Sequence, residues 1–167
     1  MAAGKSAVGR ALAHRLGWDF VDVDARVEEQ AGRSIAGIFR AEGEAEFRRR
    51  EAEVAADALK ATHVVVATGG GWAAAEGRLD ELPEGTVSVW LQVGVGEAVR
   101  RAERDGATRP LLEGGDPAKR TAQLLSERRR FYERATVGVD TEGRSVDDVT
   151  TRIQEILHEY ESGTGAE

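Results

Sequence analysis

Cysteine is absent from this sequence of 167 residues, which excludes a disulfide framework and a thiolate metal site. Long hydrophobic runs are also absent. No run approaches the ~20 apolar residues that span a membrane, and the start lacks the apolar segment of a signal peptide. We therefore expect a cytoplasmic protein without a membrane partner, and the length fits a single domain.

Acidic residues outnumber basic ones, and the formal net charge is -7. Nonspecific binding to nucleic acid needs clustered positive charge, so we expect no nucleic-acid partner. Arginine far outnumbers lysine among the 23 basic residues, as a codon bias would produce. Only arginines in a specific sequence context are therefore informative about function.

Helical and strand patterns alternate along the chain. Apolar spacings of three and four, Gly and Pro boundaries and β-branched runs give the expected elements. Helices are expected at about 5–16, 25–31, 44–60, 74–79, 97–104, 117–134 and 146–160, and strands at about 18–23, 63–67, 86–91 and 136–140. This alternation predicts an α/β fold, a three-layer sandwich whose central, mostly parallel sheet is flanked by helices. Residues 1–160 would form the domain and 161–167 a disordered tail.

The first candidate site motif is Gly4-Lys5-Ser6, at the start of the first predicted helix. Amides at a helix N-terminus favour a phosphate, a lysine there reaches the β and γ phosphates, and a serine hydroxyl binds Mg²⁺. The full phosphate-loop motif has a further glycine and a buried strand ahead of this tripeptide. Taken alone, the tripeptide fits either a nucleotide site or a chance match.

Two acidic residues come at the end of the first predicted strand. Asp22 and Asp24 are two residues apart, so they point to one side if the strand geometry persists. That side would lie at the carboxyl edge of the sheet, where open α/β sheets bind ligands. Paired carboxylates there can hold the water shell of Mg²⁺ and accept a proton from a hydroxyl nucleophile. A solvated loop is the alternative interpretation.

Three glycines follow the second predicted strand. They supply backbone N–H groups and let a ligand approach closely without a side-chain clash. A flexible turn is the alternative. The three residues are Gly69, Gly70 and Gly71.

Two arginines have contexts that suit an anionic substrate. Arg48 follows Phe47, which would hold its helix against the core, and Arg134 ends the long Arg-rich helix. A guanidinium binds a carboxylate through two parallel hydrogen bonds, so two converging arginines would clamp one. A solvated helix face is the alternative for each.

A segment at about 105–117 has the composition of a lid. Glycines flank Arg109, which could be brought over the γ-phosphate while closure excludes water. An ordinary surface loop is the alternative.

The order of these motifs resembles that of the shikimate kinase family. The matching text is GKS at 4–6, DVD at 22–24, GRSIAGIFRAEGEAEFRRRE at 32–51, GGG at 69–71, RPLL at 109–112 and YER at 132–134 leading to VDT. The resemblance covers most of the chain, and the 32–51 block is its most specific part. It implies a monomeric P-loop kinase, similar to nucleoside monophosphate kinases, that transfers the γ-phosphoryl group of ATP to the 3-hydroxyl of shikimate in chorismate synthesis.

The resemblance also implies roles for individual residues. Phosphate and Mg²⁺ contacts would come from Gly4, Lys5, Ser6 and Ala7, with Asp22 aiding the metal-water shell. Asp24 would bind shikimate hydroxyls and act as base. The carboxylate would lie on Arg48 and Arg134, beside Gly69, Gly70 and Gly71. Arg109 would be the lid arginine and Arg101 would lie near adenine, although the stretch between these two is one residue longer than the family pattern.

The chain departs from the family pattern at its front. Family members have a hydrophobic strand and the first loop glycine before the GKS motif, so we expect the central strand to be missing from this sheet. Backbone groups buried unpaired beside it would each cost about 1 to 3 kcal/mol. A start placed too late in the reading frame, or a shortened chain, would explain the departure better than a native kinase without this strand.

Two alternative functions are considered. Gluconate kinase has a similar fold and also phosphorylates a sugar acid, but the block at 32–51 counts against it. The incomplete phosphate loop suggests instead a catalytically impaired domain that binds a ligand of the shikimate type. Turnover of ATP by this chain would distinguish an active kinase from the catalytically impaired domain.

Overall fold

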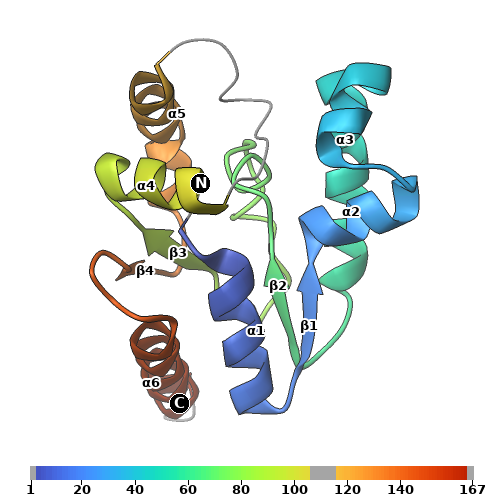
Figure 1. The fold of residues 1–167 in the computed structure, drawn as a ribbon. Helices are drawn as coiled ribbons and strands as arrows, with labels where there is room; N and C mark the ends of the chain where they lie inside the picture. The colour runs from blue at the N-terminus through green and yellow to red at the C-terminus, as the bar shows by residue number, and fades with distance from the viewer. Residues whose placement is uncertain (1–2, 106–115, 165–167) are drawn as a thin grey trace.

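The computed structural model describes residues 3–105 and 116–164, in which strands and helices alternate (Figure 1). The helices are α1 (Lys5–Leu16), α2 (Val23–Ala31), α3 (Ile35–Ala58), α4 (Val95–Asp105), α5 (Pro117–Tyr132) and α6 (Val146–Thr164). The strands are β1 (Asp19–Asp22), β2 (Val64–Ala67), β3 (Val89–Gln92) and β4 (Val137–Asp140).

The four strands form two parallel pairs. β1 pairs with β2, with Asp22 opposite Ala67, and β3 pairs with β4, with Gln92 opposite Asp140. Within residues 3–105 and 116–164, no strand joins β2 to β3. Helices flank these parallel strands, which confirms the predicted α/β fold class.

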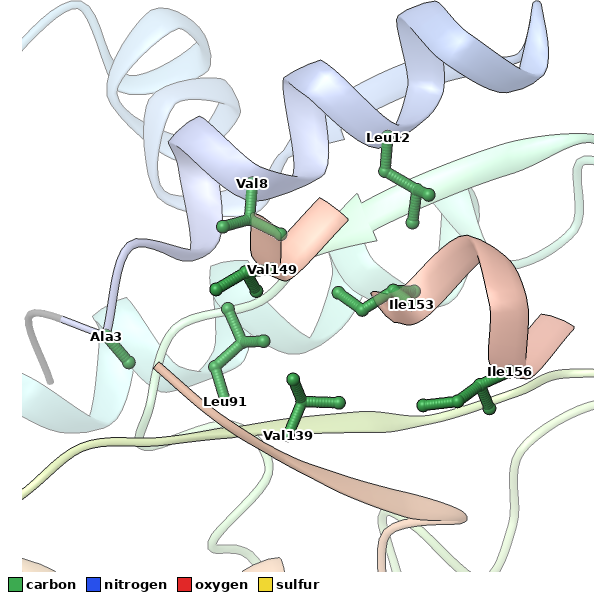
Figure 2. Close-up of a cluster of buried hydrophobic side chains, with 8 residues drawn as sticks. All are labelled: Ala3, Val8, Leu12, Leu91, Val139, Val149, Ile153 and Ile156. Atoms are coloured by element: carbon green, nitrogen blue, oxygen red, sulfur yellow. The ribbon is translucent and has the colours of Figure 1, made fainter. Parts of the chain in front are cut away.

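One hydrophobic core lies between the helix pair α1 and α6 and the strand pair β3 and β4. Figure 2 shows Val8 and Leu12 of α1 meeting Val149 and Ile153 of α6 above Leu91. The spacing of four residues in each helix places both side chains on one face. This packing fixes the start of α1 above the carboxyl ends of the strands.

A second core holds α2 and α3 against the end of β2. Val23, Val27 and Ile38 are completely buried there, next to Phe47 and Trp72. The second core therefore anchors the helix that carries Arg48, whose neighbour Phe47 is buried as expected.

Local end signals set several helix boundaries as the sequence predicts. Gly17 caps the end of α1 and Gly32 the end of α2, with positive φ of 67° and 62°. At the start of α6, Ser145 and Asp148 form a capping pair, in which the Ser145 hydroxyl donates to the Asp148 carboxylate at 2.6 Å.

Three expected boundaries differ from the structure. α3 runs from Ile35 through Gly43 instead of starting near 44, and Gly43 has φ 85° and ψ 171°, which makes a kink between two helical parts. Residues 74–79 form successive turns rather than a helix. α6 continues to Thr164, past the expected start of the tail. Among the described residues, no helix is long and apolar enough to cross a membrane.

Candidate active site

A cleft of about 1460 Å³ lies at the carboxyl ends of the strands. Its walls come from the first turn of α1, the residues that end β1 and β2, the middle of α3, and the chain that follows β4. Open α/β sheets bind ligands at this edge. The fold therefore gathers the candidate residues from distant parts of the sequence into one cavity.

The phosphate motif forms one wall of the cleft. Gly4 precedes α1 in the left-handed conformation, with φ 81°, and its carbonyl accepts a hydrogen bond from the amide of Val8 at 2.9 Å. Lys5, Ser6 and Ala7 follow in the first helical turn and line the cleft. The first amides of a helix lack intrahelical partners and carry a partial positive charge, so this wall suits a phosphate.

Asp22 and Asp24 both line the cleft, but not through the predicted strand alternation. β1 ends at Asp22, and α2 begins at Val23, so Asp24 lies in the first turn of a helix. The Asp22 carboxylate caps this helix by accepting from the amide of Ala25 at 3.3 Å. The prediction that Asp22 and Asp24 share one face of a strand is therefore wrong, because the strand ends at Asp22 and Asp24 already belongs to a helix.

Asp24 lies close to a second carboxylate, Glu51, that the sequence did not suggest. Glu51 is 1% exposed, and its Oε1 and the Oδ1 of Asp24 are buried without a hydrogen-bond partner in the described part of the chain. Burial raises the pKa of both carboxyl groups. The charges of Lys5 and Arg48 oppose this rise at Asp24. Oδ1 of Asp24 and Oε1 of Glu51 can therefore each accept a hydrogen bond from a hydroxyl group of a ligand.

Arg48 faces the cleft and is held by two acids of its own helix. Its guanidinium donates to Glu51 at 2.7 Å and to Glu44 at 3.1 Å. Both partners lie within one turn of α3, so they fix the guanidinium without help from another element. Arg48 therefore lines the cleft, and Glu51 orients it.

The glycine run closes the cleft beside these charges. Gly69, Gly70 and Gly71 line it, and the carbonyl of Gly70 accepts from the Tyr132 hydroxyl at 2.7 Å. A Cβ at Gly71 would overlap the guanidinium of Arg48. Here glycine is needed for space, since side chains approach the backbone too closely for a methyl group.

A Gly69→Ala variant is expected to raise the KM for a substrate that binds beside Asp24 at least tenfold. Its Cβ would overlap Oε1 of Glu51 and lie 3.0 Å from Oδ1 of Asp24, so both carboxylates would have to move. Gly96→Ala is the matched control, because that Cβ meets only Arg100 Nη1 at 3.7 Å. Steady-state kinetics of both variants measure the difference. Equal KM values would show that the close contact at Gly69 does not shape the site.

Arg134 does not line the cleft. α5 ends at Tyr132, and Arg134 lies beyond it, exposed, where it pairs with Asp80 at 2.6 Å. The arginine of this segment that lines the cleft is Arg128, one helical turn before Tyr132. Its charge lowers the pKa values of Glu51 and Tyr132, against the larger effect of their burial. Of Arg128 and Arg134, it is therefore Arg128 that lines the cleft together with Arg48.

The helical spacing of α5 is a signal in the sequence that indicates Arg128. Thr121, Leu124 and Tyr132 are buried on one face of α5, and Arg128 falls on that face at a spacing of four from Leu124 and from Tyr132. Arg129 and Arg130 are exposed. The helical period distinguishes among the four arginines of this segment better than their distance from the next strand.

Another wall of the cleft is formed by α4 and the chain after β4. Arg101 donates to the carbonyl of Thr141 at 2.8 Å and to Glu97 at 2.7 Å. Arg144 and Val146 line the same wall and were not predicted. Arg109 and the central part of the expected lid at 105–117 lie outside the described residues.

The cleft offers hard oxygen donors for a divalent cation. The Ser6 hydroxyl and the Asp22 carboxylate line it together, and Mg²⁺ in phosphate sites takes one or two protein oxygens plus phosphate oxygens and waters. Among the described residues there is no group of three or more His, Cys, Asp or Glu that could form a metal cage by themselves. The donor set therefore fits an ion carried with a nucleotide.

Comparison with known proteins gives one consistent result. The family model described as "Shikimate kinase" matches residues 1–158. The shikimate kinase of Symbiobacterium thermophilum is 46% identical over 161 residues, which cover 95% of this chain and 92% of that protein. The shikimate kinase of Acinetobacter baumannii, solved in complex with shikimate, has a TM-score of 0.89 and 34% identity, and the match covers 96% of this chain and 89% of that one. The shikimate kinase of Bacteroides thetaiotaomicron has a TM-score of 0.85 and 28% identity, and the match covers 95% of this chain and 94% of that one.

Proposed function

Because the chain belongs to the shikimate kinase family, we propose that its cleft transfers the γ-phosphoryl group of ATP to the 3-hydroxyl of shikimate, giving shikimate 3-phosphate and ADP. The observation that carries this proposal is the composition of the cleft. One cavity joins a helix start that suits phosphate, the partly buried carboxylate of Asp24, and the guanidinium groups of Arg48 and Arg128. The helix start suits the phosphates of ATP, and the carboxylate and arginines suit a small molecule with hydroxyl groups and a carboxylate of its own.

We assign the acceptor end to four groups. The shikimate carboxylate lies between Arg48 and Arg128, each able to donate two parallel hydrogen bonds. The ring hydroxyls donate to Asp24, whose Oδ1 is buried without a partner in the described structure. The backbone of Gly69 to Gly71 leaves room for the ring, since no side chain projects from it. Arg134 as a substrate ligand remains a sequence prediction that the geometry does not support.

The nucleotide end is assigned to the start of α1 and the wall formed by α4. The amides of Lys5, Ser6 and Ala7 and the Lys5 ammonium hold the β and γ phosphates, together with Gly4, and Arg101 lies at the adenine side. Mg²⁺, when bound, neutralises charge on the transferring phosphoryl group, and Ser6 and Asp22 would hold it. Arg109 as the lid arginine remains a prediction from the sequence.

We assign the proton transfer to Asp24, which makes the reaction depend on pH. Asp24 has a pKa raised above 3.8, first by burial and then by the charges of Asp22 and Glu28, while Lys5 and Arg48 lower it. Only the ionised form accepts a proton, so kcat/KM is expected to rise with pH through this raised pKa. The same carboxyl group binds its proton more tightly in the folded state, so its contribution to stability falls as pH rises through that window.

A pH profile of kcat/KM measures this dependence. The acid limb is expected clearly above pH 3.8, and the residual rate of Asp24→Asn is expected to lack it. A limb at or below the ordinary value, or one that persists in Asp24→Asn, would remove Asp24 from the proton transfer.

A coupled assay of ADP release tests the proposed function directly. The purified chain with ATP and Mg²⁺ is expected to turn over with shikimate and not with gluconate. Turnover with gluconate would favour the sugar-acid alternative. Absence of turnover with both, despite measurable ATP binding, would favour the catalytically impaired ligand-binding domain.

We propose that the protein works as a monomer in the cytoplasm, where ATP is abundant. In support of this, the large apolar side chains that are exposed in the described part are only Val146 and Tyr160, which are far too few for a large hydrophobic interface. Gel filtration measures the oligomeric state.

A further inference from the structure

The first part of α3 forms one wall of the active-site cleft. The residues that line the cleft there are Ser34, Ile35, Ala36, Phe39 and Arg40. We call residues 34–42 the acceptor wall. Ile35 and Phe39 also pack against the second core, which holds Phe47, so this wall belongs to the end of the cleft that contains Arg48.

Gly43 separates the acceptor wall from the rest of α3. Its φ of 85° and ψ of 171° are not helical, so the helix is kinked between the wall and Arg48. Regular helical hydrogen bonds hold successive turns at fixed positions only where the dihedral angles stay helical. The acceptor wall therefore needs contacts of its own to keep its place relative to Arg48.

Two aromatic rings connect the acceptor wall to Arg48. The ring of Phe39 contacts the ring of Phe47, with centroids 5.1 Å apart, and the guanidinium of Arg48 lies 5.1 Å from the Phe47 centroid. Aromatic pairs and cations over rings attract each other at such distances. A shift of the wall would therefore change the surroundings of the guanidinium to which we assign the substrate carboxylate.

Glu28 joins the acceptor wall to α2, the helix that carries Asp24 (Figure 1). Its Oε1 accepts a hydrogen bond from the amide of Ile35, the first residue of α3, at 2.8 Å in a partly buried position. The Ser34 side chain accepts from the amide of Gly37 at 3.2 Å. The first amides of a helix have no partner inside the helix, so this helix start depends on acceptors of this kind. Glu28 supplies the one that comes from another helix.

An effect of the Glu28 charge on Asp24 is the alternative role. Glu28 lies one helical turn after Asp24 and lines the cleft. Burial is the largest cause of the raised pKa of Asp24, and the charge of Glu28 is the smallest of the named causes. A carboxylate that accepts from an amide makes a stronger hydrogen bond than a neutral acceptor does. The geometry therefore favours the link to α3 over the effect on Asp24.

We propose that Glu28 is a positioning residue for the phosphoryl acceptor. By holding the first amide of α3, it keeps the acceptor wall in place and, through the two aromatic rings, keeps Arg48 in the arrangement that binds a small carboxylate. Glu28 acts through these groups and does not contact the substrate itself. This inference rests on the proposed function, because it takes the end of the cleft beside Arg48 to be the acceptor end.

Three variants of Glu28 distinguish the link from the charge. Glu28→Gln keeps an oxygen that can accept from Ile35 and removes the charge, Glu28→Asp keeps the charge on a shorter side chain, and Glu28→Ala removes both. The shikimate KM is expected to rise about tenfold in Glu28→Asp and Glu28→Ala and less than about threefold in Glu28→Gln. The KM for ATP is expected to change less than about twofold in all three. Glu29→Ala is the matched control, because Glu29 is the next residue of the same helix, is exposed and pairs with Arg26 at 2.8 Å.

Amide hydrogen exchange tests the link without an enzyme assay. Exchange at Ile35 is expected to be at least about tenfold faster in Glu28→Ala and Glu28→Asp than in the unchanged chain and in Glu28→Gln. The amide of Ala25, which Asp22 holds at the other end of α2, is the internal reference.

Two results would overturn the proposal. Faster exchange at Ile35 in Glu28→Ala with an unchanged shikimate KM would mean that the link supports only the fold. A KM raised equally in Glu28→Gln and Glu28→Ala but not in Glu28→Asp would assign the effect to the charge. Failure of the proposed function has a different signature. The unchanged chain would then not turn over with shikimate, although exchange at Ile35 would still respond to the Glu28 variants, and the positioning role would fall together with the function.

Discussion

Replacing Lys5 with alanine is expected to lower kcat about 10²- to 10³-fold, which corresponds to about 2.7 to 4 kcal/mol of transition-state stabilisation. Lys5 stands in the first turn of α1, on the wall that suits phosphate, and it lines the cleft close enough to Asp24 to lower the pKa of that carboxyl group. In phosphoryl transfer the protein contributes mainly positioning and charge neutralisation. Removal of this ammonium therefore acts on the transition state more than on ATP binding.

Single-turnover and steady-state kinetics at saturating ATP measure this effect. Lys60→Ala is the matched control, since Lys60 is exposed and pairs only loosely with Asp57 at 3.3 Å. Its kcat is expected to stay within about twofold, because exposed ion pairs are worth about 0 to 1 kcal/mol. An unchanged kcat in Lys5→Ala would place the terminal phosphates elsewhere.

Replacing Arg128 with alanine is expected to raise the shikimate KM about 30- to 100-fold while the KM for ATP changes less than about threefold. Hydrogen bonds to charged groups contribute about 1.5 to 3 kcal/mol, and Arg128 lies at the acceptor end of the cleft. The loss falls on ground-state binding of the carboxylate, so kcat is expected to change less than KM.

Arg134→Ala is the control for this experiment, and it also tests the sequence prediction that Arg134 binds the substrate carboxylate. Arg134 is exposed and pairs with Asp80, so its loss is expected to change the shikimate KM less than about threefold. The reverse pattern, a large rise for Arg134→Ala and none for Arg128→Ala, would show that the chain after α5 rearranges to bring Arg134 into the site.

The predictable parts of the fold were those set by local chemistry. Gly17 and Gly32 end their helices, and Ser145 with Asp148 starts α6, because these residues act on the turn that contains them. The Gly4-Lys5-Ser6 motif could be placed at a helix start for the same reason. Signals of this kind need no knowledge of the rest of the molecule.

The errors arose where tertiary contacts override a local preference. The helical part of α3 before Gly43 is longer than the sequence indicated, since Ile38 there is buried in the same core as Phe47, although the backbone of Gly43 itself is non-helical. The Ala-rich stretch at 74–79 favoured a helix, but it follows the buried Trp72 and has φ 78° at Gly77. Packing of neighbouring residues decided both cases.

The motifs of the candidate site could be found in the sequence, but the sequence did not show which further side chains lie beside them in the cleft. Asp24, Arg48 and the three glycines lie together as their motifs implied. Glu51 could not be found from the sequence, because a glutamate in the charged run of α3 looks like a solvated residue until its burial is known. Arg128 lies on the buried face of α5, whereas Arg134 is only nearer to the last strand in the sequence, and nearness along the chain does not show which side chain reaches the cleft.

The two buried carboxylate oxygens, on Asp24 and Glu51, have a consequence for the lifetime of the protein in a cell. Without acceptor substrate, these atoms weaken the folded state, since the unfolded chain would hydrate them. A ligand that binds only the folded form adds about 2.7 kcal/mol at a concentration 100-fold above its Kd. Proteases act on the unfolded fraction, so the abundance of this enzyme would follow the supply of its own substrate.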